Sequence, residues 1–145
     1  IHDSDLEYES NDLIKLYEKI SSNIKYDVIY GSRYQKRSSK FKQQLLYFIA
    51  NQLNLFLFNI LFKKKLTDLH SSYKVFKKEI ISDFKFKSMR FGFELEVTVF
   101  LAKNVINIIE LPISYSARLK QQGKKIYFLD EIKFIYNLFY FRFFS

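Results

Sequence analysis

The sequence predicts an α/β fold made of one domain. Helical patterns alternate with short β-branched runs along the chain, which is the order expected when helices cover the faces of a sheet. The 145 residues are 48% hydrophobic, enough for one core and too few for two ordinary domains. No repeat, linker or low-complexity tract divides the chain, so residues 1–145 are expected to form one unit.

The chain opens with a predicted helix and strand. Apolar residues recur at helical spacing over residues 11–22, which predicts a short amphipathic helix capped by Asn11. Residues 26–30 are β-branched and aromatic and end at Gly31-Ser32, which predicts a buried strand that enters a loop.

Residues 40–62 are strongly apolar and contain no Gly or Pro, so they predict a helix roughly 34 Å long. On a helical wheel, one half of the circumference is wholly apolar and all the amides fall within the other half. Two interpretations stay open: a core helix or helical hairpin, and a helix lying in a membrane interface with its flanking lysines at lipid head groups. The apolar half is Leu45, Leu46, Ile49, Leu53, Phe56, Leu57 and Ile60, and the amides are Gln43, Gln44, Asn51, Gln52, Asn54 and Asn59.

The second half of the chain repeats the alternation. A strand is predicted over residues 72–76, helices over 77–84 and 92–103, a strand over 105–109, and an aromatic-rich helix over 128–144. The only proline follows the last of these strands, where an edge strand or a bulge tolerates the missing donor.

Composition narrows the range of possible ligands and protein classes. The 24 Lys and Arg against 15 Asp and Glu leave a formal charge of +9, which attracts nucleic acid, phosphorylated ligands or an anionic membrane. The absence of Cys excludes a disulfide framework, and 17 Phe with 11 Tyr exclude a disordered chain. The start lacks both Met and a leader sequence, so we expect a fragment.

Three carboxylates stand at alternate positions near the start, at Asp3, Asp5 and Glu7. In an extended turn they can converge on one hard divalent cation. An isolated Asp-rich turn is more often only solvated, so the context of this motif decides its interpretation.

Further motifs follow in a set order and supply that context. Together they resemble family 2 glycosyltransferases with the GT-A fold, most of all the dolichyl-phosphate mannose synthases and bacterial polyprenyl-phosphate glycosyltransferases. The resemblance spans almost the whole chain and implies a Rossmann-like mixed sheet flanked by helices, without the N-terminal nucleotide-binding half. The motifs are Asp3-Ser4-Asp5-Leu6-Glu7-Tyr8, Gly31-Ser32-Arg33, Thr67-Asp68, Tyr73-Lys74-Val75-Phe76, Phe91-Gly92-Phe93-Glu94-Leu95-Glu96 and Glu110-Leu111-Pro112-Ile113-Ser114-Tyr115.

The resemblance implies a metal site and anion-binding residues. Asp3 and Asp5 would hold Mg²⁺ or Mn²⁺ against the donor diphosphate, and Glu7 stands where a third ligand can lie. The ion would offset the charge that builds on the leaving nucleoside diphosphate. Arg33 would contact the acceptor phosphate, for which its planar fork is suited.

Five other residues complete the implied site. Arg118 and Lys124 would bind the donor diphosphate from a loop. Asp68, Glu94 and Glu96 would orient the sugar or a basic residue, and one of them would act as general base if the acceptor were a hydroxyl. The two histidines lack the spacing of zinc ligands and are left out.

The implied function is inverting transfer of a sugar from a nucleotide sugar to a polyprenyl phosphate at the cytoplasmic face of a membrane. An alternative is transfer to a hydroxyl acceptor in cell-surface polysaccharide synthesis. A third, non-enzymatic alternative is a basic binding module. Nucleic acid is not an expected partner, because the aromatic residues sit at core spacing and do not alternate with lysines.

Overall fold

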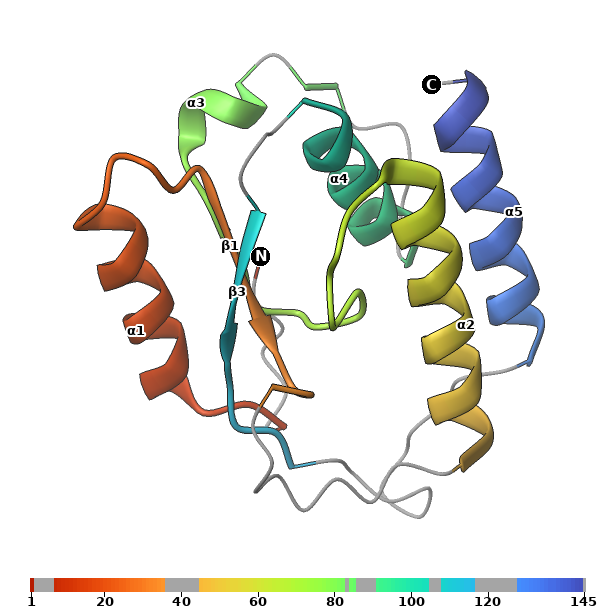
Figure 1. Ribbon diagram of the computed structural model, residues 1–145, viewed down its shortest axis with the longest axis horizontal. Helices are drawn as coiled ribbons and strands as arrows, with labels where there is room; N and C mark the ends of the chain where they lie inside the picture. Colours follow the sequence, from red (N-terminus) through yellow and green to blue (C-terminus); the bar gives the residue numbers. More distant parts are fainter. Residues whose placement is uncertain are drawn as a thin grey trace.

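The computed structural model describes residues 1, 7–35, 45–82, 84–85, 91–104, 108–116 and 128–144. These residues form helices on both sides of a small sheet, which confirms the predicted α/β class (Figure 1). The elements are α1 (Ser10–Ser21), β1 (Val28–Ser32), α2 (Leu45–Phe62), β2 (Lys74–Phe76), α3 (Lys78–Ile81), α4 (Phe91–Asn104), β3 (Ile108–Pro112) and α5 (Phe128–Phe144).

Among the described residues, the sheet has three strands in the order β2-β1-β3. Strand β2 runs antiparallel to β1, with Tyr30 opposite Lys74. Strand β3 runs parallel to β1, and their last residues, Ser32 and Pro112, are register partners. The proline therefore ends an edge strand, as its missing donor requires. On the other edge, Ile1 exchanges two backbone hydrogen bonds with Lys74.

The alternation of side chains along β1 builds two cores. Val28 and Tyr30 pack in the larger cluster, which takes in residues of α2, α4 and α5. Ile29 points to the opposite face and packs with Leu16 and Ile20 of α1. Figure 1 shows the result as layers, with α1 on one side of the sheet and α2, α4 and α5 on the other. Because successive residues of a strand face opposite ways, a strand covered on both faces is apolar throughout.

Several predicted boundaries shift. Helix α1 begins at Ser10, and its N-cap is Glu9 without a side-chain hydrogen bond, so the prediction of an Asn11 cap is wrong. Helix α3 is only four residues long, whereas the pattern predicted residues 77–84. Strand β3 extends past the predicted strand to Pro112, because parallel pairing with β1 continues to Ser32.

Helix α2 turns its amides inward and many of its apolar residues outward. Asn54 is 1% exposed, whereas Phe56, on the predicted apolar half, is 61% exposed. The Asn54 amide donates to Glu131 Oε2 of α5 at 2.6 Å. Asn59 donates to the Leu66 carbonyl at 2.8 Å and accepts from the Leu66 N–H at 3.0 Å. In the described part of the chain, no helix is long and apolar enough to cross a membrane.

Candidate functional site

Polar motif residues gather where the parallel strands β1 and β3 end. Arg33 follows β1, and Tyr115 follows β3 after a short extended stretch. In α/β sheets, ligands bind outside the carboxyl ends of the strands, because loops there project functional groups beyond the sheet. We therefore treat this end of the sheet as the candidate site.

Gly31 lets the backbone pass a crowded point just before Arg33. A Cβ at this position would lie 2.8 Å from two side-chain carbons of Ile113 and 3.1 Å from the Tyr73 Cβ. The Gly31 N–H also donates to the Tyr73 carbonyl at 2.8 Å. Only glycine fits this close approach without moving its neighbours.

A buried ion pair between Arg33 and Asp68 lies at the centre of the site. Arg33 Nε donates to Asp68 Oδ2 at 2.7 Å, and Nη2 donates to Oδ1 at 2.8 Å. The Arg33 backbone N–H donates to the same carboxylate at 3.0 Å. Burial alone would lower the pKa of Arg33, but the charge and hydrogen bonds of Asp68 outweigh it and hold that pKa well above its ordinary value. The guanidinium is thus fully charged and fixed in orientation.

Glu110 of β3 fixes the turn that carries Asp68. Its carboxylate accepts from the Thr67 N–H at 2.7 Å, the Thr67 hydroxyl at 2.9 Å and the Asp68 N–H at 2.9 Å. The Thr67 hydroxyl also lies 2.7 Å from that of Ser32. Burial raises the pKa of Glu110, and these hydrogen bonds work in the opposite direction.

Aromatic rings enclose the guanidinium on the side of α1. Tyr8 stacks on Tyr73 with ring centroids 4.8 Å apart, and the Tyr115 ring centroid lies 4.9 Å from the Arg33 Cζ. The Tyr115 hydroxyl donates to Glu7 Oε2 at 3.0 Å. Burial raises the pKa of both Tyr8 and Tyr115, so both hydroxyl groups stay protonated at neutral pH.

A second buried cation, Lys74 of β2, extends the polar network on the side of the sheet that faces α4. Its ammonium donates to the Glu94 carboxylate of α4 and to the Ser71 carbonyl. It also lies 5.1 Å from the Tyr30 ring centroid. Glu96, the other predicted carboxylate of α4, is buried.

His70 borders a small cavity beside this network. Among the described residues its Nε2 atom is buried without a hydrogen-bond partner, and burial lowers the pKa of the ring to about 4. The cavity holds about 60 Å³, room for water. Its walls come from Leu69, His70, Glu94, Leu95, Thr98 and Phe134.

A larger, open pocket of about 500 Å³ is lined by Gln35, residues 63–67 and residues 108–110. Three lysines at the end of α2 give it a basic wall, and Glu110 and Thr67 join it to the site. The positive charge of this wall would attract an anionic group such as a phosphate. The lysines are Lys63, Lys64 and Lys65.

Four predicted site residues, Asp3, Asp5, Arg118 and Lys124, lie outside the described residues. Of the predicted metal ligands only Glu7 is described, and its carboxylate is the hard oxygen donor that Mg²⁺ and Mn²⁺ prefer. Within the described ranges, no three His, Asp or Glu side chains converge as metal ligands.

Comparisons with known proteins add no relative: no family model, curated protein or solved structure matches this chain. The candidate site therefore rests on its own geometry.

Sequence reasoning assigned no role to three residues of this network. Lys74, Glu110 and Tyr115 were noted only as members of motifs. The sequence does contain a signal for Lys74, since it is the one cation in the otherwise aromatic and apolar motif Tyr73-Lys74-Val75-Phe76. Charged residues are almost never fully buried unless they are paired, so such a lysine predicts a carboxylate partner. The identity of that partner depends on the fold.

Proposed function

We propose that this chain is the acceptor-side part of a metal-dependent, inverting family 2 glycosyltransferase with a GT-A fold. It would transfer a sugar from a nucleotide sugar to a polyprenyl phosphate at the cytoplasmic face of a membrane. One observation carries the proposal: motif residues that are far apart in sequence contact one another in pairs. Arg33 bonds Asp68, Lys74 bonds Glu94, and Tyr115 bonds Glu7.

The proposed reaction suits an anionic acceptor. An oxygen of the polyprenyl phosphate attacks the anomeric carbon, a new carbon–oxygen bond forms on one face, and the bond to the nucleoside diphosphate breaks on the other. Since the phosphate is already an anion, no side chain needs to remove a proton. Asp68 and Glu94 then serve by holding Arg33 and Lys74 in place, and the lysine-walled pocket supports the choice of a phosphate ligand.

The divalent ion would be held by Asp3 and Asp5, with Glu7 as the third ligand. Mg²⁺ or Mn²⁺ supplies charge to stabilise the departing diphosphate. Arg118 and Lys124 would add cationic groups to the same diphosphate, and Glu96 would help to orient the sugar.

A transfer assay tests the proposal. The natural protein that contains this chain is incubated with radiolabelled nucleotide sugars, polyprenyl phosphate and Mn²⁺, with and without a chelator. We expect label in the lipid phase only with metal. We expect Asp5→Asn to abolish transfer and the matched variant Asp27→Asn, just before β1, to retain it. Label in a polymer instead would favour the hydroxyl-acceptor alternative, and no transfer from any donor would overturn the proposal.

A further inference from the structure

Helices α2 and α5 each expose an apolar stripe of the same length. Four residues of α2, spaced four, three and four apart, are 49% to 61% exposed. Four residues of α5 with the same spacing are 40% to 68% exposed. We name this surface the α2–α5 face. It comprises Ile49, Leu53, Phe56 and Ile60 of α2 with Ile132, Tyr136, Phe139 and Phe143 of α5.

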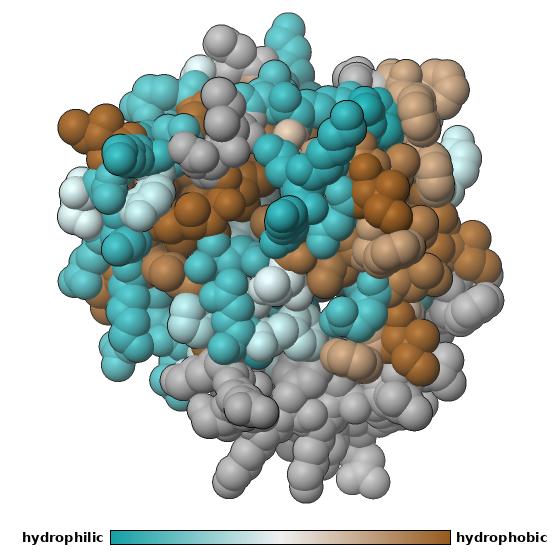
Figure 2. All heavy atoms as spheres, viewed as in Figure 1, coloured by the Kyte–Doolittle hydropathy of each residue, from teal (hydrophilic) through white to brown (hydrophobic). Residues whose placement is uncertain are grey.

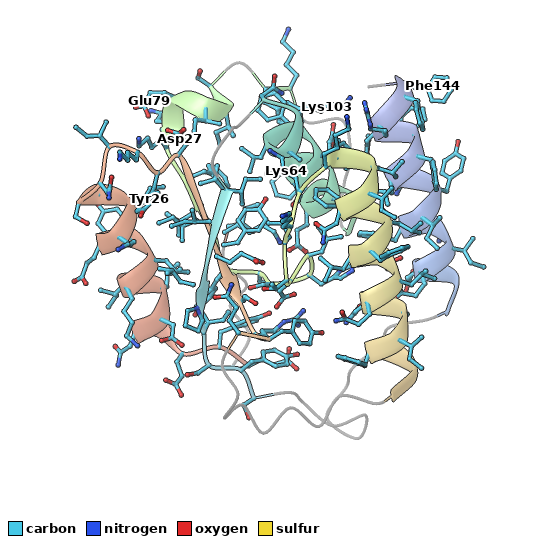
Figure 3. The ribbon with its side chains drawn as sticks, in the orientation of Figure 1. Tyr26, Asp27, Lys64, Glu79, Lys103 and Phe144 are labelled. Carbon is cyan, nitrogen blue, oxygen red and sulfur yellow. The ribbon has the colours of Figure 1, made fainter. Side chains whose placement is uncertain are left out.

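The two helices pack against each other, so the stripes belong to one region of the protein. Arg142 Nε donates to the Leu61 carbonyl at 3.0 Å, and Asn54 bonds Glu131 nearer the start of α5. Figure 2 shows hydrophobic residues gathered over α2 and α5, on the right of the view. Phe144, at the end of α5, points away from the protein in Figure 3. Soluble monomers rarely leave apolar patches of this kind uncovered.

The fold does not allow α2 to bury its stripe by rotating. The orientation of the helix is fixed by the Asn54 bond to Glu131 and by the two bonds between Asn59 and Leu66. A rotation that buried Phe56 would break these bonds and expose Phe58, which is fully buried. The stripe therefore faces outward as part of the native structure.

Charge at the border of the face indicates its partner. Lys63 and Lys65 are exposed just past the end of α2, and Arg142 is exposed in the last turn of α5. Cations beside an apolar stripe that carries Tyr and Phe are typical of helices lying in the interface of an anionic bilayer. The chain's charge of +9 adds long-range attraction to such a surface.

We propose that the α2–α5 face binds the surface of an anionic lipid bilayer, with the apolar stripes in the head-group region and the cations at lipid phosphates. This deepens the proposed function, because a polyprenyl acceptor lies in a bilayer, and it names the surface that would bring the site there. The evidence for the face is independent of sugar transfer, so the two proposals can fail separately.

Vesicle sedimentation of the full chain, without any sugar donor, tests the inference. Vesicles of phosphatidylcholine alone are compared with vesicles that also contain phosphatidylglycerol. We expect binding to the anionic vesicles that weakens with salt. Replacing Leu53, Phe56 and Ile60 together by Ser should reduce this binding about tenfold or more, because those side chains would insert.

The matched control lies across the sheet. Ile14 and Tyr17 of α1 are also exposed, and their replacement by Ser should leave vesicle binding unchanged. Thermal melting of each variant checks that it is folded.

A folded α2 variant that binds vesicles as well as the wild type overturns the proposal. So does a wild-type chain that ignores vesicles but forms dimers that the α2 variant abolishes, because the face would then bind a second copy. A wild-type protein that binds anionic vesicles but transfers no sugar counts against the proposed function alone.

Discussion

Charged side chains are buried at the carboxyl end of β1, whereas apolar side chains are exposed along α2 and α5. Both arrangements cost free energy unless a partner is present. Arg33 finds its partner within the chain, in Asp68, and the ion pair is complete. The α2–α5 face has no such cover among the described residues, and a lipid bilayer is the partner that we propose for it. Mutations in the site are therefore expected to lower the unfolding free energy, whereas mutations in the α2–α5 face are expected to weaken membrane binding.

Asp68→Ala should have the largest effect on stability. The substitution leaves the Arg33 charge buried without its carboxylate, which costs about 3–5 kcal/mol of unfolding free energy. Urea denaturation followed by circular dichroism measures this change.

The control is a partly exposed ion pair between a lysine and an aspartate. Lys77 Nζ lies 3.2 Å from Asp27, which is labelled in Figure 3 near the far end of β1. Asp27→Ala should cost no more than about 1 kcal/mol, because exposed ion pairs are screened by water. Equal losses for the two variants would contradict the picture of a closed, buried site.

Acid should lower the unfolding free energy of the protein, because the unfolded chain binds a proton at His70 more readily than the folded protein does. Its pKa is about 4 in the folded protein and near the ordinary value of 6.5 when unfolded, so the unfolded chain binds the proton more readily between these values. The unfolding free energy should therefore fall as pH drops from 6.5 toward 4, by at most about 1.4 kcal/mol per pH unit. His70→Gln should reduce that slope in urea titrations at several pH values. An unchanged slope would show that His70 is solvated.

Gly31→Ala tests the close approach that positions Arg33. The new methyl would meet Ile113 at 2.8 Å, and such overpacking costs about 1–3 kcal/mol. Adding Ile113→Ala should recover part of the loss, so the double variant would be more stable than the sum of the single effects predicts. Strict additivity in the denaturation data would mean that the two residues do not clash.

Two substitutions on α2 compare a buried polar side chain with an exposed apolar one on the same helix. Asn54→Ala removes a buried amide and its bond to Glu131, and should cost about 1–2 kcal/mol. Phe56→Ala removes an exposed ring and should change stability by no more than about 0.5 kcal/mol. This order reverses what hydropathy suggests for a helix of a soluble protein. Thermal or urea unfolding of both variants decides it, and a larger loss for Phe56→Ala would show that the ring is covered.

The local patterns predicted much of the fold. The helix at the end of the chain was predicted with the observed bounds, and the strand that became β1 was predicted to within two residues. These elements have strong periodicity or a β-branched run that ends at a glycine. The cap of α1 and the length of α3 were missed, because the ends of short helices depend on neighbouring contacts more than on local pattern.

The site was predicted only in part. Arg33, Asp68, Glu94 and Glu7 stood out as members of motifs, but nothing in their spacing showed which of them pair. Asp68 lies 35 residues beyond Arg33, and Tyr115 lies 108 residues beyond Glu7. Pairings at such distances depend on the order of strands in the sheet, which is a property of the whole chain.

By itself, the sequence determined the class of fold, most of the elements and the division of α2 into an amide half and an apolar half, because these follow from local periodicity. Only the tertiary structure decided which half faces inward. The residue pattern of one helix does not show which side faces the core until the neighbouring elements are placed. Here Glu131 and Leu66 form hydrogen bonds with the amides. The same placement of neighbours joined Arg33 to Asp68 and left Phe56 outside.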